Sequence, residues 1–259
     1  EFLLSPSQPA REILDALIRG PLVLHPAAIP EGLAGWQIAA RLEAQGLGSA
    51  ARYKELIYSE DFAQRLGVPA SSLEGYLFPS TYNLAKPVDE AKVLANMVDT
   101  LRKNLPVDWE RLAHEQGLSG LHELLTLASI VEKETGAPAE RPAIAGVFLN
   151  RLKKNMRLQT DPTVIYGLGE NFDGNIRGKD LLADHPYNTY RNKGLPPGPI
   201  ANPGIEAIAA VLHPSRTPYF YFVARGNGLH YFSRDLKTHE QAVRYYQLRK
   251  GKPPPRQEW

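Results

Sequence analysis

The sequence contains no cysteine. This excludes disulfide bonds, thiolate metal sites and a cysteine nucleophile, but it leaves the cellular compartment open because many periplasmic proteins also lack cysteine. The sequence also has no uninterrupted apolar run near the roughly 18 residues that a membrane-spanning helix needs. It opens on Glu1-Phe2-Leu3-Leu4, without a positively charged signal region. We therefore expect these 259 residues to be soluble and to be part of a longer protein.

A charge excess of either sign is missing as well. There are 30 Lys and Arg residues against 28 Asp and Glu residues, which gives a formal charge of only +2, and the basic residues are dispersed along the chain. Phosphate contacts need a concentrated basic face, so we expect no nucleic-acid partner. The hydrophobic content of 43% is enough for one large core, or for a main domain with a smaller companion.

The chain divides by its pattern of apolar and turn-forming residues. Strand-like and helix-like segments alternate before the loop-like stretch 67–72, so we predict a small module over 1–70 and a larger domain over 71–259. The larger domain is mainly helical, with a hairpin around the glycine-rich turn 225–228. The predicted class is therefore α+β. The expected helices of the larger domain lie at about 89–103, 108–116, 120–135, 141–154, 203–212 and 238–249.

Two helix starts carry recognisable capping signals. Asn202 precedes Pro203, which suits an N-cap followed by proline in the first turn. Thr238 and Gln241 match the spacing of a capping box. These signals predict that the last two helices begin at or just after Asn202 and Thr238.

The helix predicted over 120–135 is apolar around most of its circumference and ends in two glutamates, Glu132 and Glu134. Such a helix belongs inside a domain. Two positions correspond to about 200° around a regular helix, so only one of the two carboxyl groups can face a given cleft. Burial at the helix end raises the pKa of a carboxyl group, as an acid that protonates a leaving oxygen near neutral pH requires. Spacing alone also allows, and favours, simple ion pairing with Lys133, Arg141 or Arg151.

Several blocks of sequence weigh against this simpler interpretation. The segments are 74–82 (Glu-Gly-Tyr-Leu-Phe-Pro-Ser-Thr-Tyr), 127–135 (Leu-Ala-Ser-Ile-Val-Glu-Lys-Glu-Thr), 157–167 (Arg-Leu-Gln-Thr-Asp-Pro-Thr-Val-Ile-Tyr-Gly), 187–190 (Tyr-Asn-Thr-Tyr) and 194–200 (Gly-Leu-Pro-Pro-Gly-Pro-Ile). In order and spacing they resemble the endolytic murein transglycosylases of the MltG or YceG-like family. The resemblance runs from Ile29-Pro30-Glu31-Gly32 to the last helix.

This resemblance implies a LysM-like N-terminal module, only partly present within 1–70, and a catalytic domain over 71–259 whose helical core is related to lysozyme-like transglycosylases. It also implies an upstream inner-membrane anchor that this chain lacks, a position on the periplasmic face of the bacterial inner membrane, peptidoglycan glycan strands as substrate, and association with cell-wall synthases.

The resemblance also assigns site residues. Glu134-Thr135 is similar to the Glu-Ser pair that ends the catalytic helix of soluble lytic transglycosylases, so the catalytic role goes to Glu134, with Glu132 as the competing candidate. Aromatic rings stack on sugar faces, and amide and hydroxyl groups bind sugar hydroxyl and acetamido groups. Core packing, turns and caps are the alternative roles for such residues. The expected substrate-binding residues are Glu74, Gln159, Thr160, Asp161, Tyr187, Asn188, Thr189 and Tyr190.

No cofactor or metal is expected. The seven histidines are scattered, and no His-Glu-x-x-His, phosphate-loop or Gly-x-Ser-x-Gly pattern occurs. The expected reaction cleaves the bond between N-acetylmuramic acid and N-acetylglucosamine within a strand and leaves 1,6-anhydro ends. One glutamate can suffice because the substrate's own C6 hydroxyl replaces a second carboxylate. Two alternatives stay open, namely a muramidase that uses water and a noncatalytic peptidoglycan-binding scaffold.

Overall fold

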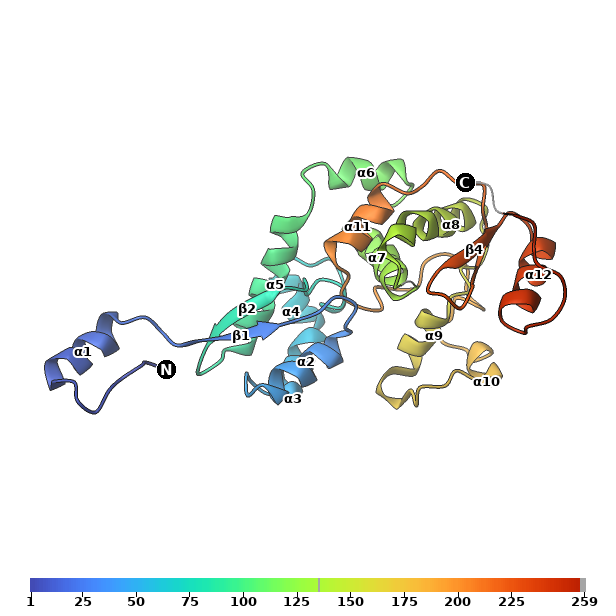
Figure 1. Ribbon diagram of the computed structural model, residues 1–259. Coiled ribbons are helices and arrows are strands. Elements are labelled where there is room, and N and C mark those ends of the chain that lie inside the picture. The colour runs from blue at the N-terminus through green and yellow to red at the C-terminus, as the bar shows by residue number, and fades with distance from the viewer. Residues whose placement is uncertain (135, 257–259) are drawn as a thin grey trace. The chain divides into compact units, whose positions relative to one another are not determined.

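The structure is a computed structural model that describes residues 1–134 and 136–256. Its backbone divides into two compact units, Glu1–Lys103 and Asn104–Trp259, and most of their helices and strands are labelled in Figure 1. Both units combine helices with a small antiparallel sheet, so the chain is an α+β protein.

The first unit is organised around a two-stranded sheet. β1 and β2 pair antiparallel, with Leu24 opposite Ala85 and Ala28 opposite Thr81. Because β2 lies beyond residue 70 and pairs with β1, the compact unit that contains residues 1–70 continues to Lys103. The elements are α1 (Ala10–Arg19), β1 (Leu24–Ala28), α2 (Gly35–Ala44), α3 (Ala50–Ile57), α4 (Glu60–Arg65), β2 (Thr81–Ala85) and α5 (Glu90–Asn104).

The start of the chain contributes little to the core. The first residues form a single bridge, between Phe2 and Leu22, and no strand. The following helix, α1, is amphipathic, but none of its residues is buried. The core of the unit is instead supplied by α2, α3 and α5, which bury Ile38, Tyr53 and Met97 among others.

The second unit is built on the buried helix α7. Eight consecutive residues of α7, from Leu124 to Val131, are buried, and α7 packs against α8 and α11. The elements are α6 (Trp109–Glu115), α7 (Leu121–Glu134), η1 (Pro138–Glu140), α8 (Arg141–Lys153), α9 (Asp161–Leu168), η2 (Gly169–Asn171), α10 (Gly178–Leu181), α11 (Ile205–Leu212), β3 (Tyr221–Ala224), β4 (His230–Ser233) and α12 (Leu236–Tyr246). The prediction that the helix carrying the two glutamates lies inside the domain is confirmed.

The backbone on either side of α11 lies close to α7 and α8, as two contacts show. A Cβ at Gly146, in the middle of α8, would lie 2.4 Å from the carbonyl oxygen of Ser215, so only glycine fits there. Buried Ser129 on α7 accepts a hydrogen bond of 3.0 Å from the backbone N–H of Ile200. Ser129 thereby fixes the loop that precedes α11, and Gly146 leaves room for the segment that follows α11.

The expected hairpin is present as β3 and β4, with Phe222 opposite Phe232. The capping predictions, however, were wrong at both helices. Helix α11 begins at Ile205 after Gly204, and α12 begins at Leu236 after Asp235. The Asp235 carboxylate accepts the Thr238 N–H at 2.9 Å, so Thr238 lies in the first turn instead of at the cap.

Candidate active site

Glu134 is the last residue of α7 and lines a cavity of about 640 Å³ in the second unit. The cavity walls come from the end of α7, the end of α8, the segment that leads into α9, the β3–β4 hairpin and α12. Its lining residues are Glu134, Arg151, Leu158, Gln159, Asp161, Tyr190, Tyr221, Phe222, Val223, Ala224, His230, Leu236, His239, Val243 and Gln247. Thr135, which follows Glu134, lies outside the described residues.

The Glu134 carboxyl group has little to stabilise its charge. Its pKa is raised from 4.5 to about 7, mainly by burial. The Thr160 hydroxyl and the Arg151 guanidinium act in the opposite direction, and the nearby Asp161 carboxylate adds to the increase. The Thr160 hydroxyl donates a hydrogen bond to Glu134 Oε1. Burial outweighs the two favourable contacts, so the group keeps its proton to a higher pH than an ordinary carboxyl group.

Glu132 occupies a different environment. Its side chain is only 6% exposed and forms an ion pair of 2.9 Å with Arg141. Its other oxygen accepts the Gly204 N–H at 3.0 Å, just before α11 begins. Glu132 is not among the residues that line the cavity. The two carboxyl groups therefore have separate partners, as the angle of about 200° between their positions predicts.

Three of the predicted substrate-binding residues line the cavity with Glu134: Gln159, Asp161 and Tyr190. The Tyr190 hydroxyl donates to Asp161 Oδ1 at 2.5 Å, which joins the 187–190 block to the start of α9. Burial and this contact with Asp161 raise the Tyr190 pKa, so its phenol keeps its proton. A donor, a carboxylate and an amide thus face the same space as Glu134.

Two of the remaining predicted residues, Thr160 and Thr189, stabilise the segment that carries Gln159 and Asp161. Thr160 and Thr189 are buried, and the Thr160 N–H donates to Thr189 Oγ1 at 3.1 Å. Thr163 Oγ1 lies 2.8 Å from Thr189 Oγ1 and completes a buried hydroxyl cluster. This cluster holds the first turn of α9 and, through Thr160, the Glu134 carboxyl group.

Tyr187 and Asn188 are not among the cavity-lining residues. The Tyr187 ring packs against Tyr166, with ring centroids 4.8 Å apart. Asn188 is 1% exposed, and its amide donates to the carbonyls of Leu181 at 3.1 Å and Ala183 at 2.7 Å. Its side chain thus fixes the loop after α10, which is the turn-forming role that was the alternative for this residue.

Glu74 lies in the first unit, where its side chain is committed to a helix end. It is 2% exposed, and both its oxygens lie 3.0 Å from the backbone N–H of Gly35, the first residue of α2. The Tyr58 hydroxyl donates to the same carboxylate at 3.1 Å. A carboxylate in this position satisfies an unpaired amide and complements the helix dipole.

Arg151 is a site residue that the sequence did not indicate. Its buried guanidinium donates to the carbonyls of Phe220 at 2.6 Å and Leu158 at 2.8 Å, and lies 5.0 Å from the Tyr221 ring centroid. It thus ties the hairpin to the segment before α9. Because basic residues are ordinary in the last turn of a helix, its position in the sequence gave no signal of this role.

The described residues contain neither a metal-binding cluster nor a membrane-spanning helix. No group of three or more histidine, aspartate or glutamate side chains in 1–134 and 136–256 is arranged to hold a metal ion. Over the same ranges, no helix has the length and apolar character needed to cross a membrane.

Fold and cavity together define an α+β protein whose second unit presents a glutamic acid with a raised pKa to a polar and aromatic cavity. The YceG-like family model matches residues 1–245, and the chain belongs to the YceG-like family. A crystal structure of a YceG-like protein from Listeria monocytogenes is 36% identical, with a TM-score of 0.75 over 92% of this chain and 82% of that chain.

Two curated relatives are named endolytic murein transglycosylase. The protein of Bacillus subtilis is 46% identical over 176 residues, which cover 67% of this chain and 48% of the relative. The protein of Streptococcus pneumoniae strain R6 is 35% identical over 176 residues, which cover 66% of this chain and 32% of the relative. The match therefore spans about half or less of each of these longer relatives.

Proposed function

We propose that this chain carries the catalytic region of an endolytic peptidoglycan lytic transglycosylase. The observation that carries the proposal is the Glu134 carboxyl group, which lines the cavity with a pKa raised to about 7. The names of the Bacillus and Streptococcus relatives support the substrate class. A carboxyl group that is partly protonated at neutral pH can donate a proton and then take one back.

In the proposed reaction, Glu134 first protonates the glycosidic oxygen between N-acetylmuramic acid and N-acetylglucosamine. The bond from this oxygen to the muramyl anomeric carbon breaks, and the Glu134 carboxylate remains. The Thr160 hydroxyl stabilises this carboxylate through its hydrogen bond. The muramyl C6 hydroxyl then gives its proton to Glu134 while its oxygen bonds to the anomeric carbon, which closes a 1,6-anhydro ring and restores the acid.

This route needs no second carboxylate and no bound water. Intramolecular attack by the C6 hydroxyl avoids the entropic cost of orienting a separate nucleophile. Tyr190, Gln159 and Tyr221 are the proposed contacts that hold the sugar, because they bring aromatic faces, a phenol and an amide to the cavity. The substrate-binding roles expected for Glu74, Thr160, Tyr187, Asn188 and Thr189 remain predictions. The contacts of Thr160 and Thr189 support an indirect effect on the site.

A hydrolytic muramidase is the second candidate, and one observation favours it. Asp161 is another carboxylate that lines the cavity, and it is close enough to Glu134 to raise the pKa of that group. Glycosidases that use water pair an acid with a second carboxylate that activates the water or attacks the sugar. In a hydrolytic mechanism, Asp161 would be this second carboxylate.

Mass spectrometry of the products separates these functions. Digestion of long glycan strands should give internal cuts whose muramyl ends are nonreducing and one water lighter than hydrolysed ends. Glu134→Gln should make no products, whereas Glu110→Gln, a change at an exposed glutamate of α6, should act like wild type. Reducing muramyl ends that disappear in Glu134→Gln would establish a muramidase. Strand binding without cleavage by the wild type would indicate the noncatalytic scaffold.

The family also supports proposals about location and organisation. We propose that the longer protein acts at the periplasmic face of the bacterial inner membrane, held by an upstream anchor, and works with cell-wall synthases. A partial LysM-like module within residues 1–70 and a catalytic domain over 71–259 remain the proposed functional division. Fractionation of cells that express the longer protein tests the location, because the proposal fails if the protein is found in the cytoplasm.

A further inference from the structure

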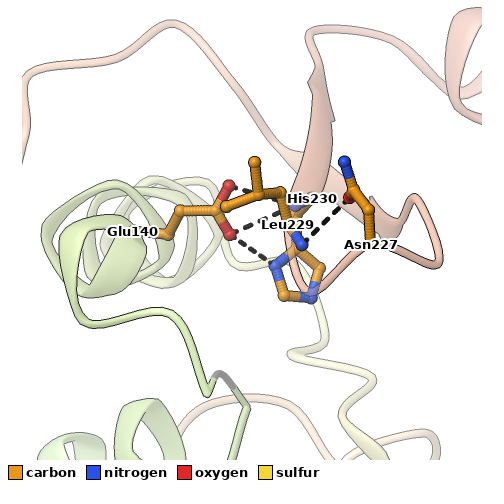
Figure 2. A network of polar contacts seen from close by, with 4 residues as sticks. All are labelled: Glu140, Asn227, Leu229 and His230. Atoms are coloured by element: carbon orange, nitrogen blue, oxygen red, sulfur yellow. Dashed lines mark hydrogen bonds and ion pairs between the residues drawn. The ribbon is translucent and has the colours of Figure 1, made fainter.

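A second carboxyl group, Glu140, holds a histidine at the wall of the same cavity. Glu140 ends η1 and His230 begins β4, and both side chains are nearly buried, at 9% and 11% exposure. The Glu140 oxygens accept the His230 backbone N–H at 3.0 and 3.1 Å, and Oε2 lies 2.7 Å from His230 Nδ1 (Figure 2). One carboxylate thereby fixes both the backbone and the ring of His230.

This contact decides what the ring presents on its other side. A carboxylate accepts hydrogen bonds, so the ring nitrogen that faces it carries the hydrogen, and in the neutral ring the other nitrogen is an acceptor. Nε2 lies on the side of the ring away from Glu140 (Figure 2), and no described residue bonds it. His230 also lines the cavity that Glu134 lines.

The ring is held rigidly in this orientation. Phe222 meets it edge to face, with centroids 5.4 Å apart, and Phe232 lies on the same strand at 6.4 Å. The hairpin turn is ordered by Asn227, whose side chain accepts the Leu229 N–H at 3.2 Å (Figure 2). A side chain fixed by packing and by a second group is typical of a ligand-binding residue held ready for its partner.

We propose that His230 is a substrate-binding residue whose Nε2 accepts a hydrogen bond from a hydroxyl or acetamido N–H group of the glycan in the cavity. Glu140 is then a positioning residue that fixes the tautomer and the angle of the ring. A structural role alone would need only the bond between Glu140 and the His230 backbone N–H. The binding role also explains why Glu140 contacts Nδ1 and why the ring lines the cavity. This assignment rests on the proposed function of the cavity.

Two substitutions of His230 separate the cavity-facing nitrogen from the Glu140-facing one. The Asn side chain reaches the position of Nδ1, so His230→Asn keeps a donor for Glu140 and removes the acceptor in the cavity. The longer Gln side chain reaches the position of Nε2, so His230→Gln keeps a polar group in the cavity. His114→Asn, at an exposed histidine of α6, is the matched control.

The first measurement is calorimetric binding of an N-acetylglucosamine tetrasaccharide, together with KM and kcat on glycan strands and the melting temperature of each variant. His230→Asn should weaken binding and raise KM about tenfold, the effect of one lost hydrogen bond, with a small change in kcat and in melting temperature. His230→Gln should recover part of the affinity, and His114→Asn should match wild type. Unchanged affinity in His230→Asn would overturn the assignment while leaving the proposed function intact.

The second measurement uses nitrogen-15 NMR of the histidine rings in the wild type. His230 should show a protonated Nδ1 and an Nε2 acceptor whose resonance moves when the tetrasaccharide binds, and Glu140→Gln should redistribute the two tautomers and weaken binding. An Nε2 resonance that does not respond to a bound oligosaccharide would overturn the assignment. A wild type that neither binds nor cleaves glycan would overturn the proposed function and this assignment with it.

Discussion

The end of α7 and the start of α2 show two opposite treatments of a buried glutamate. At the start of α2, Glu74 accepts hydrogen bonds from the Gly35 N–H and the Tyr58 hydroxyl, and it lies at the positive end of the helix dipole. At the end of α7, Glu134 lies at the negative end of a helix and accepts a hydrogen bond from the Thr160 hydroxyl. The donors around Glu74 stabilise a structural anion in the first region, whereas desolvation with fewer donors leaves the Glu134 carboxyl group easy to protonate.

Glu132 shows that the difference does not come from helix position alone. It lies two residues before Glu134, yet Arg141 and the Gly204 N–H compensate its charge. Compensation by neighbouring donors therefore distinguishes the three carboxyl groups. Glu134 has the weakest compensation and is also the one that lines the cavity, which is why we propose the acid–base role for it.

The largest expected effect is the loss of cleavage activity when the Glu134 carboxyl group is removed. Glu134→Gln should lower strand cleavage by about 10²–10⁴-fold, because the amide keeps the shape of the side chain but has no acid proton to donate. The measurement is the rate at which the purified variant releases glycan fragments. The wild-type rate should fall as the pH rises through about 7, where Glu134 loses its proton.

Glu132→Gln is the matched variant, because Glu132 lies about half a turn before Glu134 on the same helix. It should retain most of the cleavage activity while unfolding at a lower temperature, because the Arg141 side chain, which is only 12% exposed, loses its ion pair with Glu132. Loss of cleavage in Glu132→Gln, together with full activity in Glu134→Gln, would reverse the assignment of the two residues.

A smaller effect concerns stability, and its sign should differ between the two regions. Glu74→Gln should lower the free energy of unfolding by about 1–3 kcal/mol, because a buried amide contact loses its charged acceptor. Glu134→Gln should raise it at pH 8 by about 1–3 kcal/mol, because the folded state no longer carries a buried anion. Urea unfolding of both variants and wild type at several pH values measures these differences.

The pH dependence follows from the direction of the shift. The Glu134 pKa rises from its ordinary value of 4.5 to about 7 on folding, so the folded state holds a proton that the unfolded state has lost between these values. Wild-type stability from this group therefore decreases as the pH rises from 4.5 to 7 and is constant above it. The gain in Glu134→Gln should vanish near pH 4.5, and a gain that persists there would contradict the explanation.

The smallest expected effect is at Thr160. Thr160→Val removes the hydroxyl that stabilises the Glu134 carboxylate, so the Glu134 pKa should rise and the alkaline fall in activity should move to higher pH. We expect kcat to decrease about tenfold, the value of one hydrogen bond to a charged group. Thr163→Val changes the same buried cluster without touching Glu134 and should leave the pH profile in place. Identical profiles for the two variants would remove Thr160 from the account.

Much of the helical framework could be predicted from the sequence, because periodicity and composition are local. Helices α5 to α8 and the β3–β4 hairpin lie close to the predicted ranges. Helix α9 was missed, although Thr160 before Asp161 and Pro162 is a recognisable helix start. The capping prediction at Asn202 failed because a tertiary contact, Glu132 with the Gly204 N–H, lies where α11 begins. The prediction at Thr238 failed because the nearby Asp235 is the N-cap of α12.

The site could be predicted only in part. The angle between Glu132 and Glu134 implied that they face different surroundings, but which one meets Arg141 depends on how α7 packs against α8. The family motifs brought Gln159, Asp161 and Tyr190 to attention, whereas Arg151 and His230 carried no local signal. Both of these act through contacts with residues that are distant in the sequence.

The central claim is that Glu134 holds its proton near neutral pH, and its own titration tests this most directly. Carbon-13 NMR can follow the side-chain carboxyl resonances of glutamate from pH 3 to pH 9, with Glu134→Gln used to identify the signal. The account predicts a midpoint near 7 for Glu134. A midpoint at or below the ordinary value of 4.5 would contradict it, because the group would then be an anion at neutral pH and have no proton to give.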